Sequence, residues 1–95
     1  MELYTFIMEY AGGTYISQVR SNDRLGAMRK WVEELDVKSI KWFSEKRKRK
    51  LIDDDFKDEV PVLLQECTNV WCFCLRLQKG IALINIIETK SGNTR

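Results

Sequence analysis

The stretch from Val70 to Glu88, VWCFCLRLQKGIALINIIE, most constrains what this chain can fold into. It is the densest apolar run in the sequence, and Gln78-Lys79-Gly80 divides it into two segments of strand length. Two such segments, rich in β-branched and aromatic residues around a glycine-containing break, are typical of a β-hairpin. We expect Lys79-Gly80 to form the turn, which would place Phe73 opposite Ile86.

A second hairpin is predicted at the N-terminus, where Leu3 to Tyr10 and Thr14 to Arg20 flank another glycine-containing break. Gly12-Gly13 can supply the positive φ angles of a tight turn, so we expect these two residues to be the loop. Side chains alternate between the two faces of a strand. One face of this hairpin then carries the natural core residues, which are Tyr4, Phe6, Met8, Tyr10, Tyr15 and Val19.

The opposite faces of the two hairpins are also partly apolar. If both hairpins join one sheet whose other side is covered by helices, seven apolar residues would lie together on the uncovered side: Leu3, Ile7, Ile16, Cys72, Cys74, Leu83 and Ile87. Contiguous apolar groups across four strands exceed what a soluble monomer usually exposes. We expect a protein partner, or a second copy in a homo-oligomer, to cover them. The alternative is that the chain's own segment from Val37 to Leu64 folds over this face.

Two helices are expected between the hairpins. Ser21-Asn22-Asp23 offers an N-cap, and apolar residues follow at helical spacing. This stripe consists of Leu25, Met28, Val32 and Leu35. Ser44 can cap a second helix that runs to about Glu59. We interpret Val37 to Phe43 as an extended or turn segment and Val62 to Leu64 as a short strand.

The order of hairpin, helices and hairpin predicts an α+β fold. We expect two layers: an antiparallel β-sheet of four or more strands, and two helices mainly on one of its faces. With 95 residues, the chain suits a single domain over 1–95, with a core from about 3 to 89 and a frayed tail over 90–95. The sequence leaves the strand order open. It has no membrane-spanning apolar run and no secretory signal, so we expect a cytoplasmic protein that does not contact a membrane.

Several chemistries lack their usual residues in this sequence. The chain has no histidine, no glycine-rich phosphate loop and no dinucleotide fingerprint, so we expect neither enzymatic activity nor a cofactor. Three cysteines fall short of the four ligands of a structural zinc site, and we expect Cys67, Cys72 and Cys74 to be reduced, buried thiols without a metal. An enzyme that uses carboxylates is the second alternative, and its candidate residues are Asp53, Asp54, Asp55, Asp58 and Glu59.

Five consecutive cations, Lys46, Arg47, Lys48, Arg49 and Lys50, supply the main alternative function, which is contact with nucleic acid or another polyanion. Consecutive residues step about 100° around a helix, so these five would spread over all its sides instead of forming one phosphate-binding face. The net charge of +2 is also small for a dedicated nucleic-acid binder. We therefore expect the run to be mainly solvated helix surface.

Residues 3–35, LYTFIMEYAGGTYISQVRSNDRLGAMRKWVEEL, resemble the opening hairpin and helix of HicB-type antitoxins. The resemblance covers 33 of the 95 residues. The loop with proline and glycine that such domains carry before the helix is absent, because Val19-Arg20-Ser21-Asn22 leads directly into the predicted helix. No functional residue is therefore carried over. The resemblance implies binding of a partner protein without catalysis, which agrees with a protein-interaction domain as the predicted function.

Overall fold

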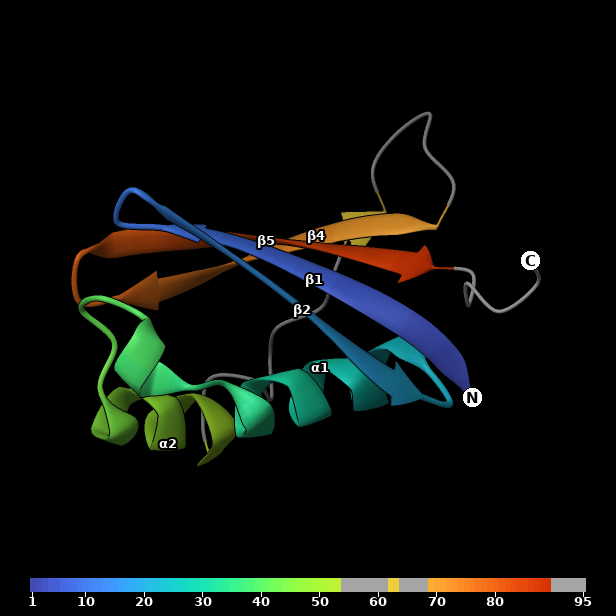
Figure 1. Cartoon of the computed structure of the whole chain (residues 1–95), viewed down its shortest axis with the longest axis horizontal. Coiled ribbons are helices and arrows are strands. Elements are labelled where there is room, and N and C mark those ends of the chain that lie inside the picture. Colours follow the sequence, from blue (N-terminus) through green and yellow to red (C-terminus); the bar gives the residue numbers. More distant parts are fainter. Residues whose placement is uncertain (54–61, 64–68, 90–95) are drawn as a thin grey trace.

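The computed structural model describes residues 1–53, 62–63 and 69–89. In chain order its elements are β1 (Glu2–Tyr10), β2 (Gly13–Ser21), α1 (Arg24–Glu34), the 3₁₀ helix η1 (Val37–Ser39), α2 (Glu45–Asp53), β3 (Val62–Leu63), β4 (Val70–Leu77) and β5 (Gly80–Thr89). The five strands form one antiparallel sheet, and the two α-helices lie on one side of it (Figure 1). The predicted α+β fold is confirmed.

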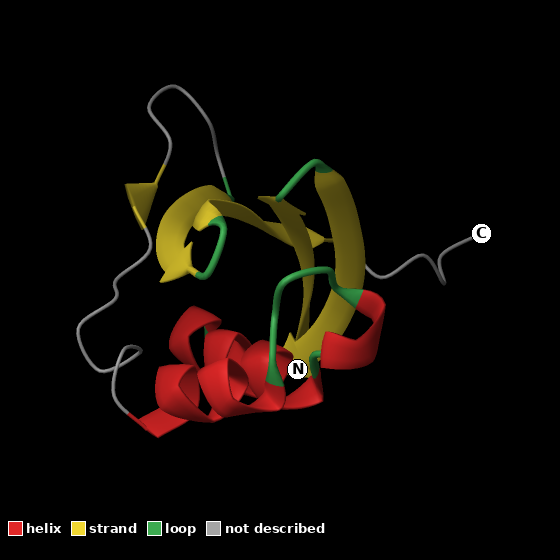
Figure 2. Ribbon diagram, turned by 90° about the vertical axis from the view of Figure 1, so that its left-hand side faces the viewer, coloured by secondary structure: helices red, strands yellow, loops and turns green. Residues whose placement is uncertain are grey.

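The strand order is β2-β1-β5-β4-β3, so the first and last strands of the chain pair at the centre of the sheet. The strands curl over the helices, which occupy the concave side (Figure 2). This curvature gives the sheet an inner face that packs against α1 and an outer face that points away from the helices. β2 is the edge strand beside α1.

Both hairpin loops lie one residue earlier than the glycines suggest. At the N-terminus, Ala11 and Gly12 form the loop with φ angles of 50° and 82°, and Gln78-Lys79 is the loop of the second hairpin. The predicted loops are wrong, and Phe73 pairs with Ile84 in place of Ile86. Each partner is displaced by two residues along the strand. Because side chains alternate with a period of two, every residue keeps its predicted face.

The core lies between the inner face and α1. Trp31 is its centre: the indole stacks on Phe6, with ring centroids 5.0 Å apart and planes at 6°, and meets Phe73 edge-on at 6.0 Å. The buried stripe of α1 consists of Ala27, Met28, Trp31 and Val32. Leu25, which the sequence places in this stripe, is 52% exposed. It lies in the first turn of α1, whereas α2 contacts the other end, where Lys48 Nζ donates to the carbonyl of Leu35.

Both predicted helix starts are confirmed. The side chain of Asp23 caps α1 by accepting the backbone N–H of Gly26 at 2.7 Å, and Ser44 Oγ accepts the N–H of Arg47 at 3.1 Å at the start of α2. Residues 54–59 of the predicted second helix lie outside the described residues, as do Leu64 of the predicted short strand and the tail over 90–95. The segment interpreted as extended or turn contains η1 followed by a turn.

Tyr10 joins three separate parts of the chain at the end of β1. Its hydroxyl donates to the backbone oxygen of Trp42 at 2.7 Å and accepts the backbone N–H of Lys79 at 2.9 Å. Trp42 has a φ of 61°, an uncommon conformation for a bulky residue. The buried hydroxyl therefore fixes the turn before α2 against the β4–β5 loop.

The pKa of Tyr4, which lies on the inner face of the sheet, is raised. Burial raises the pKa of Tyr4 above its ordinary value of 10.0, and the nearby carboxylates of Glu88 and Glu2 add to this shift. The folded state thus disfavours the ionised phenol. Its contribution to stability is complete below pH 10 and is lost as pH rises from there, because the unfolded chain ionises first.

Candidate functional site

The seven apolar residues assigned to the second face all lie on the outer face of the sheet. Along β1, Tyr4 and Phe6 are buried against the helices, while Leu3 and Ile7 alternate with them and point the other way. The same alternation holds on β2, β4 and β5. The seven residues on this face are Leu3, Ile7, Ile16, Cys72, Cys74, Leu83 and Ile87.

The register brings several of them side by side. Ile7 pairs with Ile16 across β1 and β2, and Leu83 pairs with Cys74 across β5 and β4. Ile7 is also the diagonal neighbour of Leu83, because it pairs with Asn85, two residues further along the same face of β5. Diagonal neighbours on one face lie about 7–8 Å apart, within reach of long side chains. An apolar cluster therefore crosses four strands.

Ile81 also belongs to this cluster, although the sequence reasoning missed it. It lies two residues before Leu83 on the same face and is 63% exposed, while Ile16 and Leu83 are 67% and 40% exposed. Counting the alternation of β5 back from Leu83 to the turn would have found it. We call the following residues the outer cluster: Ile7, Ile16, Cys74, Ile81 and Leu83.

A polar band separates Leu3 from the outer cluster. The Oγ1 atoms of Thr5 and Thr89 are hydrogen-bonded at 2.6 Å, and Gln18 Nε2 donates to Thr5 Oγ1 at 3.0 Å. Ile87 pairs with Thr5 across the central strands and is half-buried in this band. The predicted surface is therefore divided, and its exposed apolar part lies toward the hairpin turns.

The cysteines only partly match the buried thiols that we expected. Cys72 is half-buried and Cys74 is exposed, so the prediction is wrong for Cys74; both are free thiols. Cys67 lies outside the described residues. Cys74 contributes to the outer cluster as an exposed, weakly polar group.

The structure divides the basic run Lys46–Lys50 into two sets. The guanidinium of Arg47 donates to the backbone oxygen of Arg76, and Lys48 Nζ donates to that of Leu35 at 2.9 Å. These two cations hold α2 against β4 and against the end of α1. The other three are exposed and share one side of the helix at spacings of three and four: Lys46, Arg49 and Lys50. The five cations are thus spread around the helix as expected, and three of them share its exposed side.

The acidic residues offered for carboxylate chemistry are mostly outside the described residues. Asp53 is exposed at the end of α2, and Asp54, Asp55, Asp58 and Glu59 are not described. Within the described ranges, no three carboxylates or thiols come close enough to hold a metal ion. No helix in the same ranges has the length and apolar character needed to cross a membrane.

Comparison of the chain with protein-family models, with curated proteins and with solved structures finds no match.

Proposed function

We propose that this chain is a non-catalytic protein-association domain whose outer cluster pairs with a second copy of the same chain. The observation that carries the proposal is the exposure of Ile16, Ile81 and Leu83 in one cluster on the face opposite both described helices. Removing apolar surface from water is worth about 25 cal/mol per Å², so a partner that covers these side chains stabilises the complex.

Charges beside the outer cluster favour a two-fold arrangement. Glu9 is the neighbour of Leu83 on β1, and Arg76 is the neighbour of Ile81 on β4; both charged side chains are exposed. A two-fold axis that runs parallel to the sheet, between the facing outer faces of two copies and oblique to β5, brings Glu9 of one copy opposite Arg76 of the other. The same operation brings Ile81 and Leu83 of the two copies together, whereas Ile7 and Ile16 lie away from the axis. The surface is therefore complementary to itself in both charge and apolar character.

We expect Leu83→Arg to convert the dimer into a monomer. Two symmetry-related guanidinium groups would be buried without partners, and the cost of each unpaired charge raises the dissociation constant by about 100-fold or more. Size-exclusion chromatography with light scattering measures the change. The matched control is Leu25→Arg on α1, where a 52% exposed leucine on the helical side receives the same charge. That variant should retain the mass of the unmodified protein.

A charge exchange tests the proposed two-fold axis. Glu9→Arg and Arg76→Glu should each weaken the dimer, because each places like charges together, and the double variant should recover most of the lost affinity. Additive losses in the double variant would contradict this axis.

The exposed side of α2 supports nucleic-acid binding as a second candidate function. Lys46, Arg49 and Lys50 lie on one side of the helix, as described above. This candidate function predicts that an oligonucleotide column retains the protein and that the retention decreases as the salt concentration rises. Replacing all three residues by glutamine should abolish the retention. The same replacement at Arg29, Lys38 and Lys41, which are exposed elsewhere, should have a smaller effect. Passage through the column at low salt would exclude this function.

A further inference from the structure

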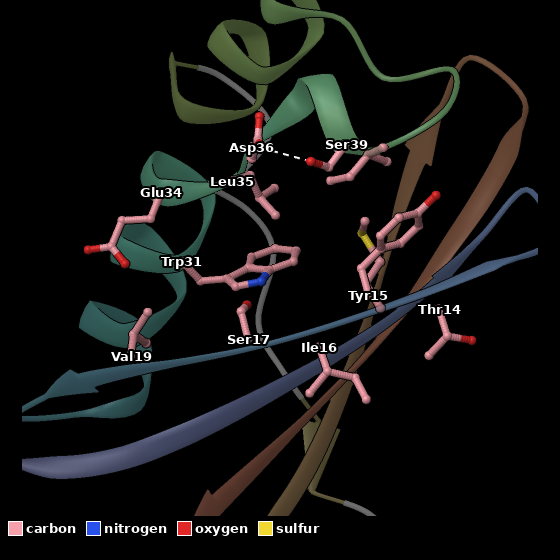
Figure 3. A pocket seen from close by; sticks show the side chains of 12 residues that line it. Thr14, Tyr15, Ile16, Ser17, Val19, Trp31, Glu34, Leu35, Asp36 and Ser39 are labelled. Carbon is pink, nitrogen blue, oxygen red and sulfur yellow. Dashed lines mark hydrogen bonds between the residues drawn. The ribbon is translucent and has the colours of Figure 1, made fainter.

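A cavity of about 420 Å³ lies between β2 and the end of α1 with η1 (Figure 3). β2 and α1 meet near Ser21 and diverge from there, so the space between them widens toward the β1–β2 turn (Figure 1). Its floor and walls are apolar: Met8, Tyr15, Val19, Trp31, Leu35 and Ile40. Trp31 points from α1 toward β2 and closes the inner end of the cavity (Figure 3). The volume is sufficient for one large apolar side chain.

The cavity reaches the free edge of β2. It touches Ile16 and Ser17, whose side chains point to opposite faces of the strand, and this is possible only where the cavity borders the backbone itself. Ser17 belongs to the helical side and is nevertheless exposed. The mouth of the cavity therefore opens beside the unpaired edge of the sheet.

The hairpin geometry tells which backbone groups of this edge are free. With a two-residue loop, the closing pair of Tyr10 and Gly13 exchanges hydrogen bonds, and such pairs alternate along an antiparallel ladder. The backbone groups of Thr14, Ile16 and Gln18 then point away from β1, as do those of Arg20. Lys30 Nζ already donates to the Arg20 oxygen at 3.2 Å. Residues 14–18 therefore present an unpaired strand edge beside the cavity.

The helical rim of the cavity is acidic. Glu34 and Asp36 are exposed on this rim, and the described residues that line the cavity include no lysine or arginine. Asp36 is held in place because its side chain accepts hydrogen bonds from Ser39 Oγ at 2.8 Å and from the backbone N–H of Lys38 at 3.2 Å. The rim therefore favours a positively charged group close to an apolar one.

We infer that this site binds an extended peptide, which adds to β2 as a sixth strand and places one apolar side chain in the cavity. An added strand obtains affinity from main-chain hydrogen bonds and specificity from alternate side chains. Residues i and i+2 of the peptide point to the same side, so the residue two positions from the apolar one reaches the acidic rim. The recognised pattern is an apolar residue with a lysine or arginine two positions away from it.

The test uses the 15N-labelled full chain and the capped peptide Ac-TTLTKTT-NH2, with Ac-TTLTETT-NH2 as its charge-reversed partner. The lysine peptide should shift the amide resonances of residues 14–18 and slow hydrogen exchange at Ile16 and Gln18. Glu34→Lys should weaken its binding by about 10-fold and improve binding of the glutamate peptide. Glu33→Lys is the matched control, because Glu33 is also exposed on α1 but does not line the cavity. The affinity of this variant for the lysine peptide should change less than about twofold.

Three results would overturn the inference: no shifts at residues 14–18 at millimolar peptide, shifts confined to Ile7, Cys74, Ile81 and Leu83, or equal effects of the two glutamate variants. If the molar mass of the protein changes but the peptide causes no shifts at this edge, β2 pairs with β2 of another copy. That result would also overturn the peptide inference. Ile16 belongs to both the outer cluster and this edge, and Leu83→Arg separates the two proposals. Leu83→Arg removes the dimer without touching the cavity, so that variant should bind the peptide as the unmodified chain does.

Discussion

Trp31→Ala should lower the free energy of unfolding by about 3–5 kcal/mol, the usual range for a large buried aromatic residue replaced by alanine. Trp31 is 2% exposed and contacts Phe6 and Phe73 from two directions, so its removal leaves a cavity between α1 and the centre of the sheet. Since domains are stable by only about 5–15 kcal/mol, the variant should be at the limit of folding.

Denaturant unfolding followed by circular dichroism measures this loss, and Leu25→Ala is the matched control. The sequence pattern gives Leu25 and Met28 the same role, but Leu25 is exposed at the start of α1. Its replacement should change the free energy of unfolding by about 0.5 kcal/mol or less. Similar losses of unfolding free energy in the Trp31→Ala and Leu25→Ala variants would show that α1 presents a different side to the sheet.

Tyr10→Phe should lower the free energy of unfolding by about 1–3 kcal/mol. The ring is retained, but the backbone oxygen of Trp42 and the backbone N–H of Lys79 both lose their hydrogen-bond partner, the Tyr10 hydroxyl. Hydrogen exchange should increase first at the Lys79 amide and in the turn before α2. Tyr15→Phe, which changes a half-buried tyrosine on the next strand, should have a much smaller effect. Equal losses would mean that the Tyr10 hydroxyl does not hold these segments together.

The faces of the strands could be predicted from the sequence, but their register could not. Alternation has a period of two, so an error of one residue in each loop moves a partner by two positions and leaves every side chain on its face. The loop positions themselves depend on φ. Ala11 takes a φ of 50° and Gly13 enters the strand, a choice that a Gly-Gly pair does not reveal.

The inner side of α1 was only partly predictable. Met28 and Val32 are buried as expected, and Trp31, which borders them in the sequence pattern, is buried beside them. Ala27 is buried as well, because burial follows the sheet and α2 rather than hydrophobicity alone. Leu25 shows the limit of the pattern: the spacing fits, and no described helix covers its end of α1. The role of a stripe residue thus depends on contacts that are distant in sequence.

The candidate surfaces, too, could be predicted from the sequence only in part. The residues of the outer face follow from alternation, whereas the polar band of Thr5, Gln18 and Thr89 depends on cross-strand pairing that the sequence does not specify. The cavity beside β2 could not be predicted at all. It requires β2 to be an edge strand, which follows from the strand order that the sequence left open, and it requires α1 to diverge from β2.

The molar mass of the unmodified chain over a dilution series tests the central claim most directly, that the outer face of the sheet, which no described helix covers, associates with a second copy. Light scattering should give a mass near twice 11.2 kDa at high concentration, falling toward 11.2 kDa on dilution. A constant mass of 11.2 kDa for the folded protein at every concentration would contradict it.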